Sequence, residues 1–137
     1  MANALSIIDK RRDIGNRITF VFQCLLSGSY VTSTTIGVAG ETLNFNAASN
    51  PKLIARPKLP GSPAGVLPPN SAIKVVRCPD GYDALVEQNA VSPTQANYVL
   101  RLFTSGDTAL GSGAYPAGVT GDTTGFIIEV TVPLKYD

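Results

Sequence analysis

Few side chains in this sequence could carry out chemistry, and histidine is missing from all 137 residues. Histidine is the most common general base, and it belongs to the Ser-His-Asp and Cys-His arrangements and to most zinc and haem sites. Its absence removes these classes of site together. We therefore expect no catalytic residue, no metal site and no cofactor, and we predict that the protein is not an enzyme.

Two pairs of carboxylates remain as candidates. Asp80 and Asp83 stand on either side of a predicted tight turn, where two carboxylates can act as acid and base if their pKa values are separated. Asp107 and Asp122 close the two ends of a Gly/Thr-rich loop and could bind Ca²⁺, although the D-x-D-x-D spacing is missing. We interpret both pairs as turn and loop residues, with acid–base catalysis and calcium binding as the alternatives.

The cysteines and one tyrosine are the other candidates. Cys24 continues an apolar alternation and is expected to be a buried free thiol, and a disulfide with Cys78 is the alternative. Tyr115, next to Pro116 in a loop of small residues, is expected to be an exposed aromatic side chain for a protein contact. The chain has no Trp, which weakens a stacking platform for sugars or bases.

Composition limits the class of partner. The formal net charge is +1, so no overall field attracts nucleic acid or an acidic membrane surface. The most apolar stretch, residues 18–26, is about half the length of a membrane-spanning helix, and the first residues lack the pattern of a signal peptide. We expect no nucleic-acid partner, no membrane partner and folding in a reducing cytoplasm.

Alternating apolar residues and frequent turn signals predict an all-β fold. Pro79-Asp80-Gly81 has the chemistry of a tight turn and is predicted to join its two flanking strands as a β-hairpin. The predicted strands cover residues 17–27, 30–35, 41–45, 72–78, 82–88, 96–104, a short segment within 114–119, and 126–135. About eight strands of this kind indicate an antiparallel β-sandwich or jelly roll, with a small β-barrel as the alternative.

The whole chain, residues 1–137, is predicted to be one domain with two irregular segments that could contact a partner. Residues 1–16 are expected to form an N-terminal arm, and residues 47–71, which hold six of the ten prolines, a long connection that cannot pair as a central strand. The predicted partner-contact residues are Lys10, Arg11, Arg12, Arg56, Lys58, Tyr115 and Pro116. A solvated turn is the alternative for the Lys10–Arg12 cluster.

A short motif links the sequence to a known class. Tyr30, followed after a gap by Gly40-Glu41-Thr42-Leu43, resembles the Gly-x-Tyr-x-x-Gly-Gly-Glu-x-Leu signature of tailed-phage capsid decoration, or head cement, proteins. Ala39 stands where a second glycine is usual, and the gap is longer. The resemblance implies a jelly roll or related β-sandwich that binds the outside of an icosahedral capsid and stabilises contacts between major capsid subunits.

The resemblance also implies a partner and a location. The partner would be the major capsid protein, and the protein would be a homo-oligomer (dimer or trimer) or be present in many copies on the virion shell. Alternatives are a tail, collar or adaptor component of the virion, and a lectin-like ligand-binding β-sandwich. Deletion of residues 2–13 is expected to weaken binding to the shell and to leave the fold intact.

Overall fold

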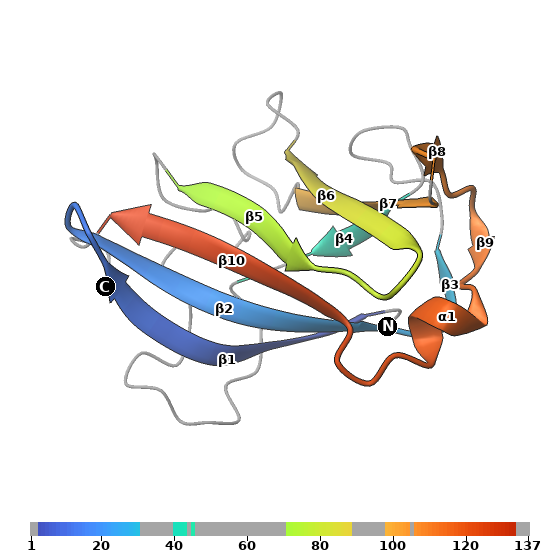
Figure 1. Cartoon of the computed structure of the whole chain (residues 1–137), viewed down its shortest axis with the longest axis horizontal. Coiled ribbons are helices and arrows are strands. Elements are labelled where there is room, and N and C mark those ends of the chain that lie inside the picture. Colours follow the sequence, from blue (N-terminus) through green and yellow to red (C-terminus); the bar gives the residue numbers. More distant parts are fainter. Residues whose placement is uncertain are drawn as a thin grey trace.

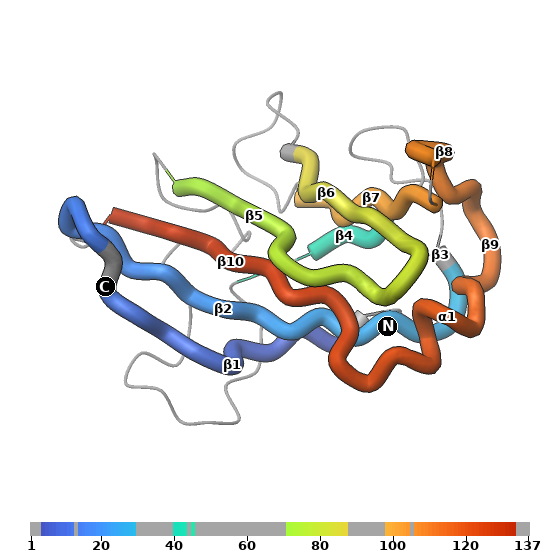
Figure 2. The backbone as a smooth tube through the Cα atoms, in the orientation of Figure 1, coloured from blue at the N-terminus to red at the C-terminus, as the bar shows by residue number. Residues whose placement is uncertain are grey.

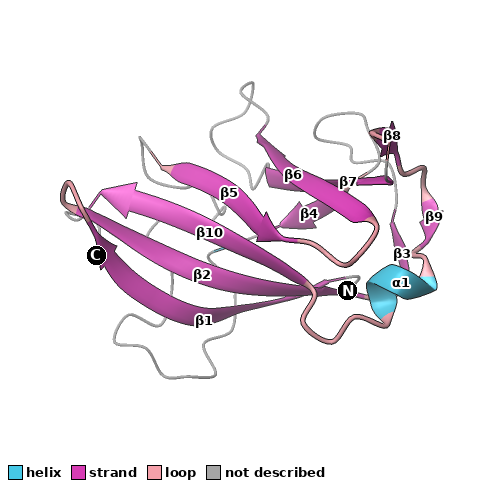
Figure 3. Ribbon diagram, viewed as in Figure 1, coloured by secondary structure: helices cyan, strands magenta, loops and turns pink. Residues whose placement is uncertain are grey.

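The computed structural model of the chain describes residues 3–30, 40–43, 45, 71–88, 98–104 and 106–133. Within these ranges every pair of strands is antiparallel, and the only helix is a single turn (Figure 3). The predicted antiparallel all-β fold is therefore confirmed. The elements are β1 (Asn3–Asp13), β2 (Arg17–Leu26), β3 (Ser29–Tyr30), β4 (Glu41–Leu43), β5 (Ala72–Arg77), β6 (Tyr82–Gln88), β7 (Tyr98–Thr104), β8 (Thr108–Ala109), β9 (Gly113–Ala114), α1 (Ala117–Thr120) and β10 (Phe126–Pro133).

The strands form two main sheets, the first across the left and centre of Figure 1 and the second at its upper right. The first sheet has the order β1-β2-β10-β5, and β2 is a central strand, as its alternation predicts. The second sheet has the order β4-β7-β6, with β8 paired to β7. A two-stranded ribbon of β3 and β9 lies at one end of the molecule (Figure 1).

One apolar core lies between the two sheets. Side chains on successive residues of a strand point to opposite faces, and β10 alternates strictly between buried and half-buried positions along its length. The core residues of the first sheet include Ile7, Ile18, Phe20, Phe22, Cys24, Leu26, Phe126, Ile128, Val130 and Val132; those of the second include Leu43, Tyr98, Leu100 and Leu102. The inner faces of the two sheets thus bury each other, which is the arrangement of a β-sandwich.

An aromatic residue outside the strands connects the two inner faces. The Phe45 ring contacts Phe22 of the first sheet with ring centroids 4.9 Å apart, and Tyr98 of the second sheet with centroids 5.8 Å apart. Both pairs have interplanar angles of 61°, the edge-to-face geometry that aromatic rings prefer.

The predicted hairpin of residues 72–78 and 82–88 is wrong. β5 pairs with β10 in the first sheet, whereas β6 pairs with β7 in the second, so the turn at Pro79–Gly81 carries the chain from one sheet to the other (Figure 2). The turn itself is as expected, since Gly81 has a φ of +85° and the Tyr82 N–H donates to the Pro79 carbonyl over 3.1 Å. Alternation predicts which side chains are buried, but it does not distinguish two strands of one sheet from two strands of facing sheets.

The expected N-terminal arm is also corrected, because residues 3–13 form the edge strand of the first sheet. β1 pairs along its length with β2, from Asn3 opposite Leu26 to Asp13 opposite Arg17. Ile7 of this strand is fully buried in the core. Deletion of residues 2–13 would therefore expose the apolar side chains that β1 covers, and we now expect it to destabilise the fold. The expected connection, residues 47–71, lies outside the described residues except for Ser71.

The glycine-rich segment after β7 contains more structure than the one short strand expected for it. Among the residues described there, β8 returns along β7, β9 pairs with β3, and α1 begins directly after Pro116. These elements are too short to produce a detectable period in the sequence.

We predict that two isoleucines of the β1–β2 hairpin differ sharply in their effect on stability. Ile7→Ala should lower the free energy of unfolding by about 2–5 kcal/mol, because it removes a fully buried side chain from the core. Ile14→Ala is the matched control and should change it by less than about 0.5 kcal/mol, because Ile14 is 98% exposed. Urea unfolding measures both values, and equal effects would contradict the core position of β1.

Candidate functional site

The predicted basic cluster is divided by the alternation of β1. Lys10 lies opposite Phe20 in the pairing, and its Nζ is 5.9 Å from the centroid of that buried ring. Arg11 points to the other face, where it forms an ion pair with Glu129 of β10 over 3.0 Å. Arg12 is exposed near the end of the strand. The side chains of Lys10 and Arg11 thus contact other residues of the first sheet. Arg12 is the member of the cluster best placed to contact a partner.

The turn that follows β1 carries an unusual apolar residue. We call residues Arg12–Arg17 the hairpin end. Gly15 and Asn16 have φ values of +83° and +59°, so they supply the left-handed conformations that tight hairpin connections require. This geometry leaves the side chain of Ile14 98% exposed at the tip, between Arg12 and Arg17. The sequence carries a weak signal for it, a lone isoleucine next to a Gly-Asn turn.

Tyr115 was predicted to be an exposed contact residue, and the structure corrects this. Its side chain is 6% exposed and belongs to the core. Its hydroxyl donates a hydrogen bond to a carboxylate oxygen of Glu41, and its backbone N–H donates to the Gly28 carbonyl over 3.0 Å. The neighbouring Pro116 is half-buried and caps the start of α1. Tyr115 therefore fastens the loop to the sandwich and offers no stacking surface.

The Gly40–Leu43 motif has a structural explanation at three of its positions. A Cβ added to Gly40 would lie 2.1 Å from the Cγ1 of Val99, so a larger residue fits only if Val99 or β4 moves. Glu41 accepts the hydrogen bond from Tyr115, and Leu43 is fully buried in the core. The motif thus locks β4 against β7 and against the loop that carries Tyr115.

Asp80 and Asp83 lie beside an open cavity of about 500 Å³ at the turn between the sheets. We call this cavity the corner pocket. Both aspartates are exposed, and the apolar side chains of Val75, Val76 and Tyr82 also line the cavity. The pocket therefore has apolar residues in its lining next to two negative charges. Within the described residues, no group of three or more Cys, Asp or Glu side chains is placed to hold a metal ion.

Asp122 holds a loop in place. Its carboxylate oxygens are engaged in hydrogen bonds within the protein, which argues against the alternative that they bind Ca²⁺. Its two carboxylate oxygens accept hydrogen bonds from Arg77 over 2.9 and 3.1 Å, and the backbone N–H groups of Thr124 and Gly125 donate to it over 3.0 and 2.9 Å. These bonds, first of all those from Arg77, lower the pKa of Asp122 to about 2. Asp107 is exposed in the turn before β8.

The outer face of the second sheet presents a mixed apolar and charged surface. Leu85 of β6 is 41% exposed and lies opposite Arg101 of β7. The Arg101 guanidinium stacks over the Phe103 ring at 5.2 Å and forms an ion pair with Glu87 over 2.5 Å. Arginine and aromatic side chains are enriched at protein-binding surfaces. We call these four residues the Leu85 surface.

Both cysteines are free, as the thiol interpretation expects. Burial raises the pKa of the Cys24 thiol to about 12, and burial also raises the pKa of Cys78. Neither thiol is thus poised as a nucleophile. Of the predicted contact residues, Arg56 and Lys58 lie outside the described residues. Helix α1 has four residues, and no helix in the described part of the chain could span a membrane.

We predict that the Arg77–Asp122 pair makes stability depend on pH in the acid range. The folded-state pKa of Asp122, about 2, lies below the ordinary value of 3.8, so the pair stabilises the fold above about pH 4 and this contribution is lost as the pH falls toward 2. Asp122→Asn should lower the Tm most above about pH 4, and the difference from wild type should shrink in more acidic buffer. Asp107→Asn controls for the loss of one negative charge, and a pH-independent difference for Asp122→Asn would contradict the prediction.

A second prediction concerns the close contact at Gly40. Gly40→Ala should destabilise the protein, by about 1–3 kcal/mol, because the new methyl group forces Val99 or β4 to move. Gly111→Ala is the matched control, since a Cβ at that glycine meets no atom within 4 Å. Thermal unfolding of both variants tests this, and equal stability would show that β4 moves freely.

The chain was also compared with known proteins. No protein-family model, no curated protein and no solved structure matches it.

Proposed function

We propose that this protein is a structural virion component that binds the outside of an icosahedral phage capsid and stabilises contacts between major capsid subunits. The observation that carries the proposal is the Gly40–Leu43 motif, the segment that resembles decoration proteins. Its glycine, glutamate and leucine each have a role in holding the sandwich together. A resemblance at positions that determine packing supports a shared fold better than a resemblance at free surface positions does.

The described surfaces suit a protein whose work is binding. The Leu85 surface lies on paired strands of a sheet, and its side chains are held by an ion pair and a stacking contact. Such preorganised side chains lose little freedom when a partner binds. Many copies that each bind weakly to one shell also act together through their high effective concentration.

The structure gives less support to the lectin-like alternative. That alternative depends on Tyr115 as a stacking surface, and Tyr115 is buried with its hydroxyl bonded to Glu41.

We propose the Leu85 surface as the contact with the major capsid protein. The predicted contacts at Arg56 and Lys58 are kept as part of the proposal.

The proposal is tested by adding purified protein to capsids assembled without it. We expect saturable binding in many copies per particle, counted by quantitative mass spectrometry, and a higher temperature of capsid disruption when the protein is bound. Absence of binding to capsids, or binding at about a dozen copies to a tail or collar, would contradict the proposal.

Two matched leucine variants test the contact surface. Leu85→Asp should weaken capsid binding about tenfold or more, because it places a carboxylate in a desolvated contact. Leu25→Asp changes a leucine of similar exposure, 36%, on β2 in the other sheet and should bind like wild type. If wild type binds capsids and the two variants bind equally well, the Leu85 surface is not the contact, but the proposed capsid-binding function still stands.

A further inference from the structure

The hairpin end and the corner pocket have complementary chemistry, because one presents an exposed apolar side chain among basic residues and the other an open cavity with apolar and acidic residues. The hairpin end projects the side chain of Ile14, 98% exposed, with basic residues on both sides of it. Its surroundings, residues 10–17, contain four basic residues and one acidic residue, Asp13. Of the basic residues, Arg11 is paired with Glu129 and Arg17 donates a hydrogen bond to the Thr131 carbonyl, whereas Arg12 is exposed beside Ile14. An isolated apolar side chain within a basic rim fits an apolar pocket with an acidic rim.

The corner pocket has these properties. Val75, Val76 and Tyr82 give it apolar walls, and Val76 is 42% exposed. The exposed carboxylates of Asp80 and Asp83 line it as well. The basic lining residue is Arg77, whose guanidinium is engaged by both carboxylate oxygens of Asp122, so the two aspartates set the charge of the pocket.

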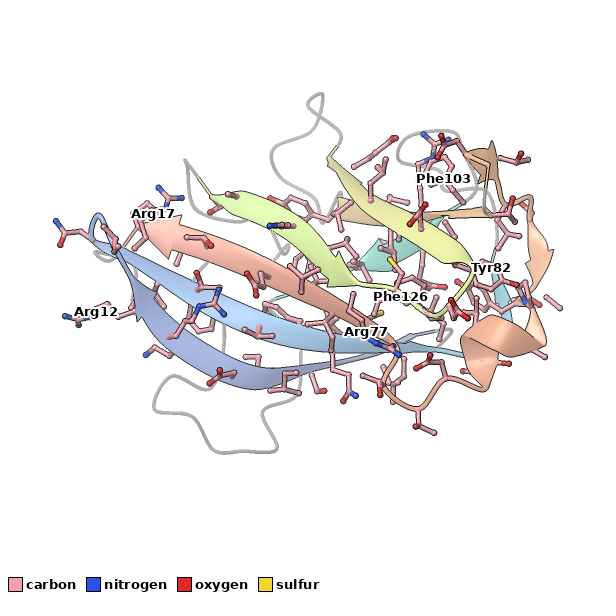
Figure 4. All side chains as sticks on the ribbon, viewed as in Figure 1. Arg12, Arg17, Arg77, Tyr82, Phe103 and Phe126 are labelled. Atoms are coloured by element: carbon pink, nitrogen blue, oxygen red, sulfur yellow. The ribbon has the colours of Figure 1, made fainter. Side chains whose placement is uncertain are left out.

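The two features cannot meet within one molecule. Arg17 begins β2, whereas Arg77 pairs with Ile127, which in turn pairs with Gln23 further along β2. Arg17 and Gln23 are six positions apart, which corresponds to about 20 Å of strand. Figure 4 shows Arg12 and Arg17 at the left end of the molecule and Tyr82 and Arg77 in its right half.

We propose that the hairpin end of one copy docks into the corner pocket of a second copy, with Ile14 in the cavity and Arg12 and Arg17 facing Asp80 and Asp83. The contact is heterologous, since it joins two different surfaces, so a dimer keeps an unused pocket on one copy and an unused hairpin end on the other. Copies joined in this way form a closed ring or an open chain. This self-association does not depend on the proposed role on a capsid.

Solution mass measured by light scattering after size exclusion tests the contact. Wild type should form oligomers whose population rises with protein concentration and falls with salt. Ile14→Asp should weaken self-association about tenfold or more, and so should Asp80→Lys combined with Asp83→Lys. These positions are exposed, and circular dichroism checks that both variants remain folded.

A mixture of the two variants distinguishes this heterologous contact from a symmetric contact, in which both copies would use the same surface. The Ile14→Asp variant retains an intact pocket, and the Asp80→Lys, Asp83→Lys variant retains an intact hairpin end. An equimolar mixture should therefore form dimers that go no further, although each variant alone is monomeric. A mixture that remains monomeric, or a wild type that is monomeric up to about millimolar concentration, would overturn the proposal.

Cys78 permits a second, independent test, because it lines the pocket and is only partly buried. With diamide as the oxidant, Ile14→Cys should form a disulfide with Cys78 of another copy, two thiols giving up two hydrogens to the diamide. Non-reducing gels should show a ladder of covalent multimers. Adding Cys78→Ser should abolish it, since Cys24 is fully buried. Without Cys78, two thiols at position 14 can join at most two copies, so a ladder that extends beyond a dimer in this variant would overturn the proposed pairing.

Discussion

Phe45 lies between the two sheets, with its ring in edge contact with Phe22 on one side and Tyr98 on the other. Each sheet has an apolar inner face that water would otherwise meet, and burial of that area is the main favourable term in folding. Contact between the inner faces fixes which side of each strand is outside. The positions of the hairpin end, the corner pocket and the Leu85 surface all follow from this packing.

Much of the fold could be predicted from alternation alone. The buried faces of β2, β7 and β10 and the buried thiol of Cys24 agree with the sequence pattern. Strand partners could not be predicted, because β5 and β6 show the same alternation whether they share a sheet or face each other. The N-terminal segment was mistaken for an arm because its charged residues hide a strand that alternates around a bulge between Ile7 and Asp9.

The candidate surfaces were harder to predict for a physical reason. A type of side chain does not determine its exposure: Tyr115 sits in a loop of small residues and is buried, whereas Ile14 is apolar and exposed. The neighbours of a charged residue likewise decide whether it is engaged within the protein. Arg11 forms an ion pair with Glu129, and Arg77 forms one with Asp122. The surfaces available to a partner are those whose side chains are exposed in the folded protein or are fixed at its surface by neighbouring side chains.

The place of β10 has a consequence for how the chain folds. β10 lies between β2 and β5, yet its residue Phe126 pairs with Cys24, so this pairing closes a loop of about a hundred residues. Contacts between residues so distant in sequence form slowly. Until β10 is inserted, one side of β2 has unpaired backbone groups next to its row of apolar side chains. That strand edge is open to pairing with other chains, and thus to aggregation, until β10 covers it.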